Sequence, residues 1–357
     1  MKILLDIGHP AHVHYFRHFM RIMQENGHEF LVTARDKEIT FALLESYDIP
    51  YVNRGKGGSS MFGKLLYMVK ADLFLWKQAR RFRPDLFMSF ASTYAAHASW
   101  FSRKPHIALD DTEHAKLELL LYPPFTNVIL TPDCFSKDLG KKHLKLQSFI
   151  EFSYLHTNCF KPDPGIKQQL GLGEDERFVL FRYISWGAAH DVGQSGIPDA
   201  EKKELIALFL ERSYKVFISA EGELDPEFEP YRISIPPEKI HDVINRADFF
   251  IGESGTMSTE ACILGTPAVF VNSLNAGVFE EEARRGLLYS FRSPQGVTDR
   301  VTELLNQQDL QQQHSERSAL LHDEKIDVTA FLVWFVEHYP KSFELMKQDP
   351  DYQLRFR

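Results

Sequence analysis

The chain has 357 residues, of which 44% are hydrophobic and 25% are charged, and its formal net charge is -8. These proportions are typical of folded globular proteins and exclude a disordered chain, a collagen-like repeat and a single small module, while the length predicts about two domains. The acidic balance offers no long-range attraction for phosphate backbones, so we predict no nucleic-acid partner.

The cysteines indicate a reducing compartment. Cys134, Cys159 and Cys262 are odd in number and show no CxxC spacing. This excludes a disulfide framework or a zinc knuckle as the expected scaffold. The first apolar run meets Asp6 too early for a signal peptide, and no run approaches the roughly 18 apolar residues of a spanning helix. We expect a cytoplasmic protein whose membrane contact would be peripheral, at the inner membrane surface.

Short apolar runs alternate with amphipathic segments over residues 1–150, which is the pattern of a parallel sheet covered by helices. The predicted strands are 3–7, 29–33, 85–90, 106–109 and 127–130. The predicted helices are 13–25, 37–46 and 62–82, the last preceded by a glycine-rich loop over 55–60. We therefore predict an N-terminal Rossmann-like domain over residues 1–150.

A second α/β series follows a stretch rich in proline, glycine and charge between 141 and 176, where we place the domain boundary. Its predicted strands are 178–183, 216–219, 249–252 and 268–271, and its predicted helices are 199–211, 238–246, 258–264 and 298–305. This predicts a second Rossmann-like domain over 176–324. An apolar stripe between 328 and 339 predicts a helical tail, 325–357, that packs on the N-terminal domain.

The segment ADFFIGESGTMSTEACILGTPAVFVN reads as buried strand, small-residue turn, helix and second buried strand. Ser254, Gly255 and Thr256 fall at the helix start, where free amides and the positive helix end suit a diphosphate. Thr256 or Ser258 is expected to cap the helix, and Gly255 to let an anion approach the backbone. Glu260, one turn further, would reach the ribose. The alternative is a turn that is purely structural, since any buried βα unit needs a cap.

Gly8, His9, His12 and His14 follow the first predicted strand. Ligands bind at such strand ends in open parallel sheets, and a histidine there can exchange a proton near neutral pH. We predict that His12 is the general base for an acceptor hydroxyl and that Gly8 and His9 contact the nucleotide sugar. The alternative is that these histidines cap the helix or donate to backbone carbonyls.

Asp110, Asp111 and Glu113 follow the strand 106–109. Paired carboxylates at a strand end can bind sugar hydroxyls, act as a base or hold a cation. We predict that Asp111 contacts a sugar hydroxyl. Adjacent aspartates are also common in capped turns.

Arg182, Trp186 and His190 follow the first strand of the second domain. Arg182 is expected to offset the charge of the departing diphosphate, Trp186 to stack on a base or sugar ring, and His190 to contact the nucleotide sugar. The alternative is a buried aromatic residue beside a surface arginine pair. The acidic run 280–282 would bind sugar hydroxyls or begin a solvated helix.

The segment KLLYMVKADLFLWKQARRFR, from Lys64, mixes large apolar residues with lysine and arginine. That composition suits a membrane surface or a lipid-linked acceptor. Burial against the sheet explains it as well, and we expect burial because a Rossmann half needs a covering helix.

Several of these motifs are similar to known ones. The Ser-Gly-Thr turn, Glu260 and the Leu-Gly-Thr-Pro that follows resemble the nucleotide-sugar site of GT-B glycosyltransferases and non-hydrolysing UDP-sugar 2-epimerases. The chain as a whole resembles domain of unknown function family 354, predicted glycosyltransferases, in the following segments: DIGHPAHVHYFRHFM, GHEFLVTARD, LDDTEHAK, FRYISWGAAHD and GESGTMSTEACILGTP. This resemblance implies an α/β protein of GT-B fold, with two Rossmann-like domains whose parallel sheets face a cleft. It implies that residues 1–150 hold the acceptor and residues 176–324 the nucleotide sugar. It also implies that Glu113 acts in proton transfer and that no metal is bound.

The resemblance also implies an activity. A glycosyltransferase would move a sugar from a nucleoside-diphosphate sugar, with UDP as the expected nucleotide and no further cofactor, to a hydroxyl of a sugar or lipid-linked acceptor in surface-polysaccharide or glycolipid synthesis. The alternatives are a UDP-sugar 2-epimerase, in which Glu113 would belong to the acid/base set, and a non-catalytic nucleotide-sugar-binding protein. The run Ala91, Ser92, Thr93 stands where the epimerases carry an acidic residue, which weakens the epimerase interpretation.

Overall fold

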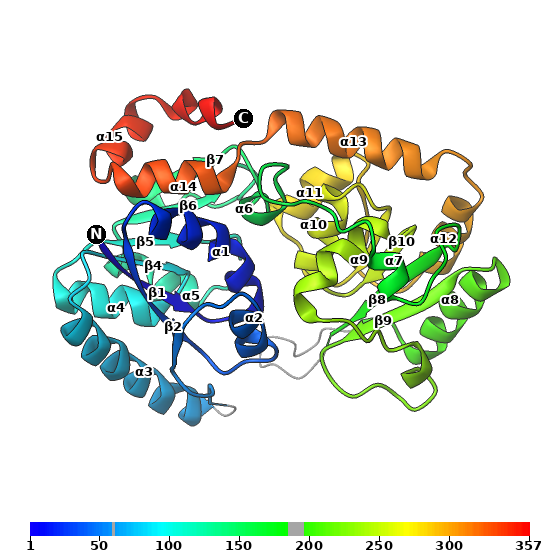
Figure 1. Ribbon diagram of the computed structural model, residues 1–357, viewed down its shortest axis with the longest axis horizontal. Helices are drawn as coiled ribbons and strands as arrows, with labels where there is room; N and C mark the ends of the chain where they lie inside the picture. Colours follow the sequence, from blue (N-terminus) through cyan, green and yellow to red (C-terminus); the bar gives the residue numbers. More distant parts are fainter. Residues whose placement is uncertain (59–60, 185–195) are drawn as a thin grey trace. The chain divides into compact units, whose positions relative to one another are not determined.

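A computed structural model describes residues 1–58, 61–184 and 196–357 (Figure 1). The chain forms two compact units, one made of Met1–Cys159 with Lys325–Arg357 and the other of Phe160–Glu324. Each unit contains one parallel sheet flanked by helices, so the predicted α/β class is confirmed. Within the described ranges, no helix is both long enough and apolar enough to span a bilayer.

The sheet of the first unit has seven strands in the order β3-β2-β1-β4-β5-β6-β7, all parallel. Its strands are β1 (Lys2–Ile7), β2 (Glu29–Ala34), β3 (Tyr51–Asn53), β4 (Leu86–Phe90), β5 (His106–Leu109), β6 (Val128–Pro132) and β7 (His143–Leu146). Its helices before the boundary are α1 (Pro10–Glu25), α2 (Thr40–Ser46), α3 (Met61–Phe82), α4 (Thr93–Ser102), α5 (Glu118–Leu121) and α6 (Phe152–Leu155). The strands of the centre read as apolar runs because helices cover both faces of a parallel sheet.

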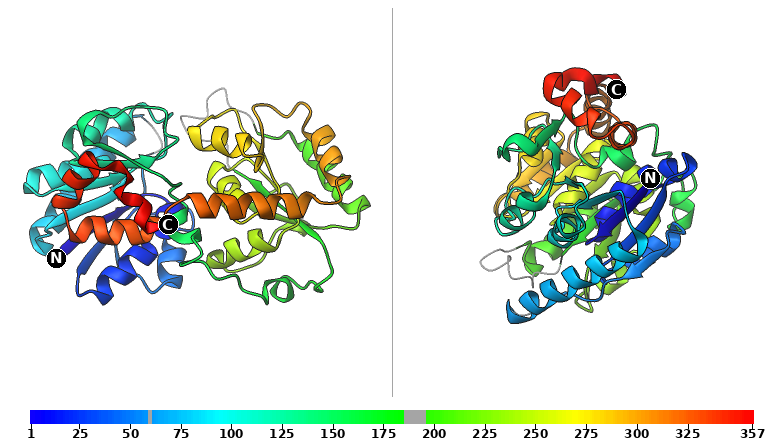
Figure 2. Two further views of the ribbon diagram at one scale, coloured as in Figure 1. Left: turned by 90° about the horizontal axis from the view of Figure 1, so that it is seen from above. Right: turned by 90° about the vertical axis from the view of Figure 1, so that its left-hand side faces the viewer.

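The end of the chain completes the first unit with α14 (Val328–Glu337) and α15 (Lys341–Gln348), drawn in orange-red and red in Figure 2. Asp327 caps α14 by accepting from the backbone N–H of Ala330 at 2.9 Å. The Thr329 hydroxyl donates to the carbonyl of Ser153 at 2.6 Å, and α14 packs on α1. The tail is therefore anchored by buried polar contacts as well as by its apolar stripe.

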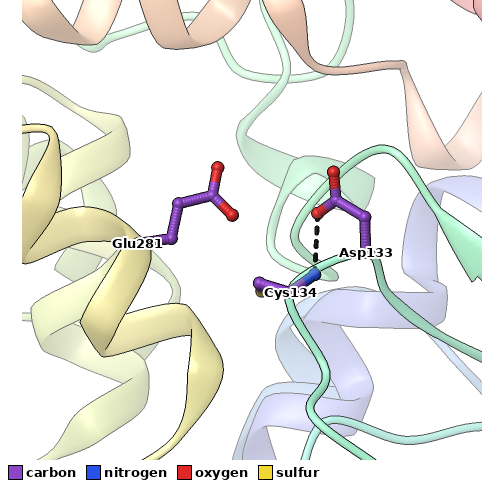
Figure 3. Close-up of side chains that lie close together, drawn as sticks. All are labelled: Asp133, Cys134 and Glu281. Carbon is purple, nitrogen blue, oxygen red and sulfur yellow. Dashed lines mark hydrogen bonds between the residues drawn. The ribbon is translucent and has the colours of Figure 1, made fainter. Parts of the chain in front are cut away.

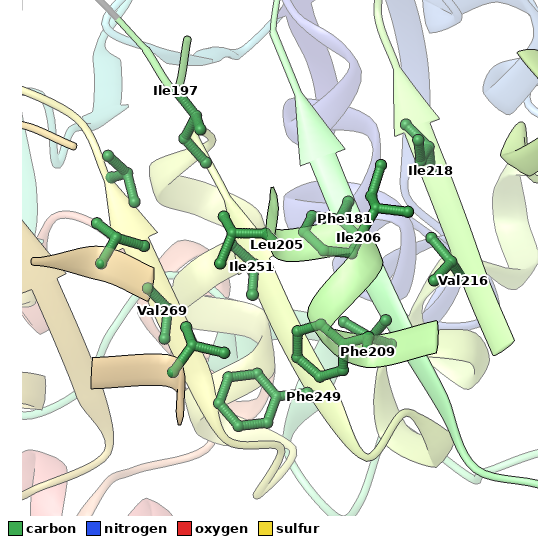
Figure 4. Close-up of a cluster of buried hydrophobic side chains, with 14 of the residues drawn as sticks. Phe181, Ile197, Leu205, Ile206, Phe209, Val216, Ile218, Phe249, Ile251 and Val269 are labelled. Carbon is green, nitrogen blue, oxygen red and sulfur yellow. The ribbon is translucent and has the colours of Figure 1, made fainter. Parts of the chain in front are cut away.

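The sheet of the second unit has five parallel strands in the order β12-β11-β10-β8-β9. Its strands are β8 (Phe178–Tyr183), β9 (Lys215–Ala220), β10 (Phe249–Gly252), β11 (Ala268–Val271) and β12 (Leu288–Phe291). Its helices are α7 (Ile166–Gln169), α8 (Asp199–Glu211), α9 (Ile240–Arg246), α10 (Gly255–Ile263), α11 (Gly277–Arg284), α12 (Val297–Leu305) and α13 (Leu310–Glu324). Phe181, Phe209, Phe249 and Ile251 lie in the apolar core between sheet and helices (Figure 4).

Both sheets contain a point at which the strand order reverses. In the first unit the chain leaves β3 at one edge and returns on the other side of β1 as β4. In the second unit β8 pairs with β9 on one side and with β10 on the other. The chain therefore moves from β8 to β9 in one direction and returns past β8 to form β10. Open α/β sheets bind ligands outside the carboxyl ends of the strands at such points. A binding site is therefore expected at the carboxyl ends of β1, β4, β8 and β10.

Candidate functional site

The carboxyl end of β1 holds a buried ion pair that the sequence analysis did not single out. The Asp6 Oδ1 lies 3.0 Å from the Nε of Arg54, and both side chains are almost completely buried. The hydroxyl of Thr33 donates to Asp6 Oδ1 at 2.8 Å, and the hydroxyl of Ser92 donates to Oδ2 at 2.6 Å. The guanidinium of Arg54 also lies 4.7 Å from the ring centroid of Tyr94. A buried pair is tolerated when other hydrogen bonds support it, and here the two hydroxyls bond to Asp6 while Nη1 of Arg54 donates to the Tyr67 hydroxyl at 3.0 Å.

The loop after β4 is strained and ordered by the same network. Ala91 has a φ of 45°, in the left-handed region that residues with a Cβ seldom adopt. Backbone strain of this kind persists where the surrounding contacts fix it, and it is common near binding sites. The Ser92 hydroxyl caps α4 by accepting from Ala95 N–H at 3.3 Å while donating to Asp6. The loop has no acidic residue of its own, yet a carboxylate from β1 reaches it.

The histidines after β1 are used mainly to shape the start of α1. The Nδ1 of His9 accepts from the backbone N–H of Ala11 at 3.2 Å, which makes His9 the N-cap. The Nδ1 of His12 accepts from the backbone N–H of Gly8 at 3.2 Å. Both contacts agree with the alternative that these histidines cap the helix. Gly8 and His9, predicted to contact the nucleotide sugar, therefore lie in the turn that begins α1.

The state of His12 argues against its predicted role as general base. Its Nδ1 lone pair is engaged by a backbone N–H, so the neutral ring carries its proton on Nε2. Burial, helped by the neighbouring charges of Lys37 and Arg54, lowers the pKa of His12 to about 3. A base this weak is a poor proton acceptor at neutral pH. In this arrangement His12 is a hydrogen-bond donor through Nε2.

The acidic residues after β5 include a carboxyl group whose pKa lies closer to neutrality than that of His12. Asp110 is buried and accepts from the Tyr122 hydroxyl at 2.6 Å and from the backbone N–H of Thr112 at 2.8 Å. Asp111 accepts from the Thr112 hydroxyl at 3.0 Å. Burial, followed by the charge of Asp110, raises the pKa of Asp111 to about 7. Neighbouring carboxyls that cannot both ionise easily keep a proton between them, as acid/base catalysis near neutral pH requires.

Glu113, the predicted acid/base residue, points to a different neighbour. Its carboxylate accepts from both the backbone N–H and the hydroxyl of Ser136, in the loop that follows β6. In that loop the Asp133 carboxylate accepts from the backbone N–H of Cys134 at 3.0 Å (Figure 3) and from the Lys325 ammonium at 3.1 Å. Figure 3 also draws Glu281, which belongs to α11 of the second unit. Within the first unit the geometry thus favours Asp111 over Glu113 for proton transfer.

In the second unit the turn after β10 leads directly into α10. Ser254 is the N-cap and accepts from the backbone N–H of Met257 at 3.5 Å, whereas Ser258 donates its hydroxyl back to the Ser254 carbonyl at 2.8 Å. The expectation that Thr256 or Ser258 caps this helix is therefore wrong, because Ser254 precedes the first helical residue. In the described part of the chain, the amides of Gly255 and Thr256 have no acceptor. Free amides at a helix start are suited to an anion.

Gly255 has a packing role besides any contact with a ligand. A Cβ at this position would lie 2.5 Å from Cζ of Phe279, on α11. Phe279 in turn packs against Phe270 of β11, with ring centroids 4.6 Å apart. A glycine is therefore required here for α10 and α11 to approach each other, a reason that the sequence analysis did not consider.

The two acidic residues around this turn have structural partners. Glu260, the predicted ribose ligand, is 3% exposed, and its Oε1 lies 3.0 Å from Nε2 of His241 on α9. Glu253, directly after β10, is buried and accepts from the backbone N–H groups of Ile184 and Ile197. A ribose contact by Glu260 would have to share its carboxylate with His241.

Arg182 lies on β8, next to β10. Its Nη2 donates to Glu221 Oε1 at 2.6 Å, and its Nη1 donates to the Ser219 hydroxyl at 2.9 Å. Its positive charge is therefore shared with a carboxylate rather than held free for an anion. Trp186 and His190, predicted to bind the nucleotide sugar, lie outside the described residues.

The first unit also contains a cavity of about 250 Å³ away from these strand ends. It is lined by cationic and apolar side chains of α1 and β2, among them Arg17, His18, Met20, Arg21, Phe30 and Val32. Burial, helped by the charges of the two arginines, lowers the pKa of His18 to about 4, so its ring is neutral at pH 7. No predicted site residue lines this cavity.

Two α/β units, each built on one parallel sheet, form the architecture of the GT-B fold. More narrowly, the chain belongs to the family described as "Protein of unknown function (DUF354)", whose profile matches residues 1–276. The chain is also 22% identical over 280 residues to uncharacterized protein MJ0665 of Methanocaldococcus jannaschii, covering 75% of this chain and 81% of the relative. The family predicted from the sequence is thus confirmed.

Solved structures confirm the GT-B fold. The S. aureus MnaA-UDP co-structure is 14% identical with a TM-score of 0.69, covering 96% of this chain and 97% of that one. UDP-GlcNAc 2-epimerase from Neisseria meningitidis bound to UDP-GlcNAc is 13% identical with a TM-score of 0.68, covering 88% and 94%. Spinosyn rhamnosyltransferase SpnG complexed with spinosyn aglycone is 13% identical with a TM-score of 0.62, covering 95% and 100%. At these identities the likeness is one of fold.

Proposed function

We propose that this protein is a glycosyltransferase that uses a UDP-sugar and glycosylates a hydroxyl of a sugar or lipid-linked acceptor in the synthesis of a surface polysaccharide or glycolipid. The second unit would bind the diphosphate at the start of α10, and the first unit would hold the acceptor. The observation that carries the proposal is the placement of a carboxyl group able to exchange a proton near pH 7, Asp111, at the carboxyl edge of a GT-B sheet. The similar structures bound to UDP and UDP-GlcNAc support the donor class.

The transfer has two chemical requirements. The acceptor O–H bond breaks as its oxygen bonds to the anomeric carbon, and the bond from that carbon to the diphosphate oxygen breaks with its electron pair leaving on the diphosphate. Asp111, in its ionised form, would take the acceptor proton, since a base is most effective when its pKa lies near the working pH. The amides of Gly255 and Thr256 would stabilise the leaving diphosphate. Arg182 would add to this while sharing its charge with Glu221.

A 2-epimerase is the second candidate, favoured by one observation. Asp6 places a carboxylate oxygen 2.6 Å from the Ser92 hydroxyl, in the loop where the sequence shows no acidic residue. Together with Asp111 this gives two carboxyl groups at the ends of nearby strands. The two reactions separate cleanly, because epimerisation breaks a carbon–hydrogen bond that transfer leaves intact. Incubation with UDP-GlcNAc in deuterated water, followed by NMR, would show label at the second sugar carbon only for an epimerase.

The donor site is tested by calorimetry and thermal shift with UDP-sugars, UDP and uridine. A ligand at about one hundred times its dissociation constant should stabilise the folded protein by about 2.7 kcal/mol. UDP and at least one UDP-sugar should do so, while uridine, which lacks phosphate, should not. A panel in which no nucleoside diphosphate or its sugar binds would refute the proposal. Binding of a UDP-sugar without transfer to any extracted acceptor would instead favour a non-catalytic binding protein.

The base is tested by paired variants in the same loop. Asp111→Asn should lower the transfer rate by about 10²-fold or more with unchanged affinity for UDP, because the substitution lies in the other unit. Glu113→Gln is the matched control and should retain activity, since that carboxylate is bonded to Ser136. Full activity in Asp111→Asn with loss in Glu113→Gln would return the role to Glu113.

A further inference from the structure

Helix α3 has two apolar faces, of which the sheet covers only one. Ala71, Leu75 and Ala79 are buried against the first unit. The opposite face exposes Leu66 by 47%, Val69 by 51%, Leu73 by 59% and Trp76 by 37%. These four recur at spacings of three and four, so they lie along one side of the helix. The expectation that burial accounts for this segment therefore holds for half of it, and the other half remains to be explained.

The neighbouring elements extend the exposed apolar surface. Helix α4 packs beside α3 (Figure 1), where the ring of His97 bonds to Asp72 at 3.0 Å. At the end of α4, Trp100 is 57% exposed and Phe101 is 60% exposed. Leu117, directly before α5, and Leu120, within it, are 62% and 72% exposed. The short turn Pro123–Phe125 contacts both α4 and α5 and so connects these helices. We call these eight residues of α3, α4 and α5 the apolar face. Exposed large apolar side chains gathered on adjoining elements mark an interaction surface.

The charges around the apolar face point to the kind of partner. Helix α3 exposes four cationic side chains, Lys70, Lys77, Arg80 and Arg81, in a chain whose net charge is -8. Its acidic residue, Asp72, is bonded to His97. The guanidinium of Arg80 lies 5.1 Å from the ring centroid of Trp76, so one cation and one indole form a single amphipathic unit. Tryptophan beside lysine and arginine is the composition that sits at the headgroup level of a bilayer.

We propose that the apolar face of α3, α4 and α5 docks on an anionic lipid bilayer. The leucine, valine, phenylalanine and tryptophan side chains enter the boundary between headgroups and acyl chains, and the α3 cations contact the lipid phosphates. Association of this kind needs no spanning helix, and none is found within the described ranges. The inference goes beyond the proposed reaction and does not depend on it, because none of the eight residues of the apolar face is a candidate site residue.

Co-sedimentation with phosphatidylcholine vesicles containing one-quarter phosphatidylglycerol tests the apolar contribution. The full chain should sediment with these vesicles, and the double variant Leu73→Gln, Trp76→Gln should partition at least about tenfold less, since burying a leucine-sized side chain contributes more than one tenfold step. Leu320→Gln is the matched control, because Leu320 is 60% exposed on α13 of the second unit. Both substitutions replace exposed residues, so circular dichroism should show intact folding.

The charge contribution is tested in the same assay. Each of Lys77→Gln and Arg80→Gln should weaken binding to the anionic vesicles by about fivefold, leave the weaker binding to pure phosphatidylcholine unchanged, and make binding less sensitive to salt. Absence of sedimentation of the unaltered chain would overturn the proposal, as would an equal loss in Leu320→Gln. Conversion of a dimer to a monomer by the double variant, with vesicle binding unaffected, would show instead that a second copy of the chain covers this face.

Discussion

The sharpest test of the first unit is the substitution Asp6→Asn. The Asp6 and Arg54 side chains are 0% and 2% exposed, so solvent screens their attraction very little. Asparagine keeps the size of the side chain but leaves the guanidinium of Arg54 buried without a counter-charge. Breaking a buried pair on one side typically costs about 3–5 kcal/mol, because the desolvation of the remaining charge is no longer offset. We expect a loss of this size in the stability of β1 and its neighbours.

A matched control lies on the same two strands. Lys2 and Glu29 form an ion pair at 3.2 Å between β1 and β2, with side chains 43% and 64% exposed. Exposed pairs contribute about 1 kcal/mol or less, so Glu29→Gln should have a small effect. The double variant Asp6→Asn, Arg54→Met should recover most of the loss, because it removes the buried charge together with its missing partner.

Hydrogen exchange is the suitable assay, since a chain of two units has no single unfolding midpoint that assigns a loss to one of them. Amides of β1 and β2 should lose about two to three and a half orders of magnitude of protection in Asp6→Asn. Amides of β8, in the second unit, serve as the internal reference and should not change. Equal hydrogen-exchange protection of β1 and β2 in Asp6→Asn and Glu29→Gln would refute the reasoning. Losing the buried pair would then cost no more stability than losing the exposed one.

Three further predictions concern the candidate site and the core. Burial raises the pKa of Asp111 from 3.8 to about 7, so its own contribution to folding stability falls as pH rises from about 4 to about 7. Asp111→Asn should remove this contribution, so the gain in hydrogen-exchange protection of β5 amides in the variant over the unaltered chain should grow with pH across that range, and a difference that does not change with pH would contradict it. Gly255→Ala should weaken UDP binding in calorimetry, because the added Cβ displaces Phe279. Adding Phe279→Ala should restore binding if packing is the cause, and no recovery would assign the loss to the ligand contact. Burial raises the pKa of the Cys262 thiol well above its usual range, so a thiol reagent should label Cys262 only after the protein unfolds, as measured by mass spectrometry. Rapid labelling of the folded chain would show instead that α10 opens.

The centre of each sheet could be predicted from the sequence because parallel strands covered on both faces are apolar along their length. Residues 178–183 and 249–252 were expected as strands and form β8 and β10 with those bounds. The missed strands β3, β7 and β12 lie at sheet edges. They have only three or four residues, and each carries polar side chains, so their apolar signal is too short to separate from a loop.

The site was harder to predict because its partners are distant in sequence. The Ser92 hydroxyl that bonds Asp6 comes from a loop 86 residues away, and a lone aspartate at the end of an apolar run does not reveal this. The same holds for proton affinity. His12 and Asp111 both looked able to exchange a proton, yet burial lowers the pKa of the first to about 3 and raises that of the second to about 7. The sign of the shift follows from the charge of the ionised form, but its presence depends on burial by the fold.

These pKa shifts bear on the choice between the two enzymatic functions. Epimerisation through removal and return of a carbon-bound proton needs groups that can both give and take protons around the sugar. Asp6 is the counter-charge of the buried Arg54 guanidinium, which commits its carboxylate to a structural contact. In the described part of the chain Asp111 has no such ion pair, and burial raises its pKa to about 7, which suits the single deprotonation that glycosyl transfer requires. The electrostatics of the first unit therefore favour transfer over epimerisation.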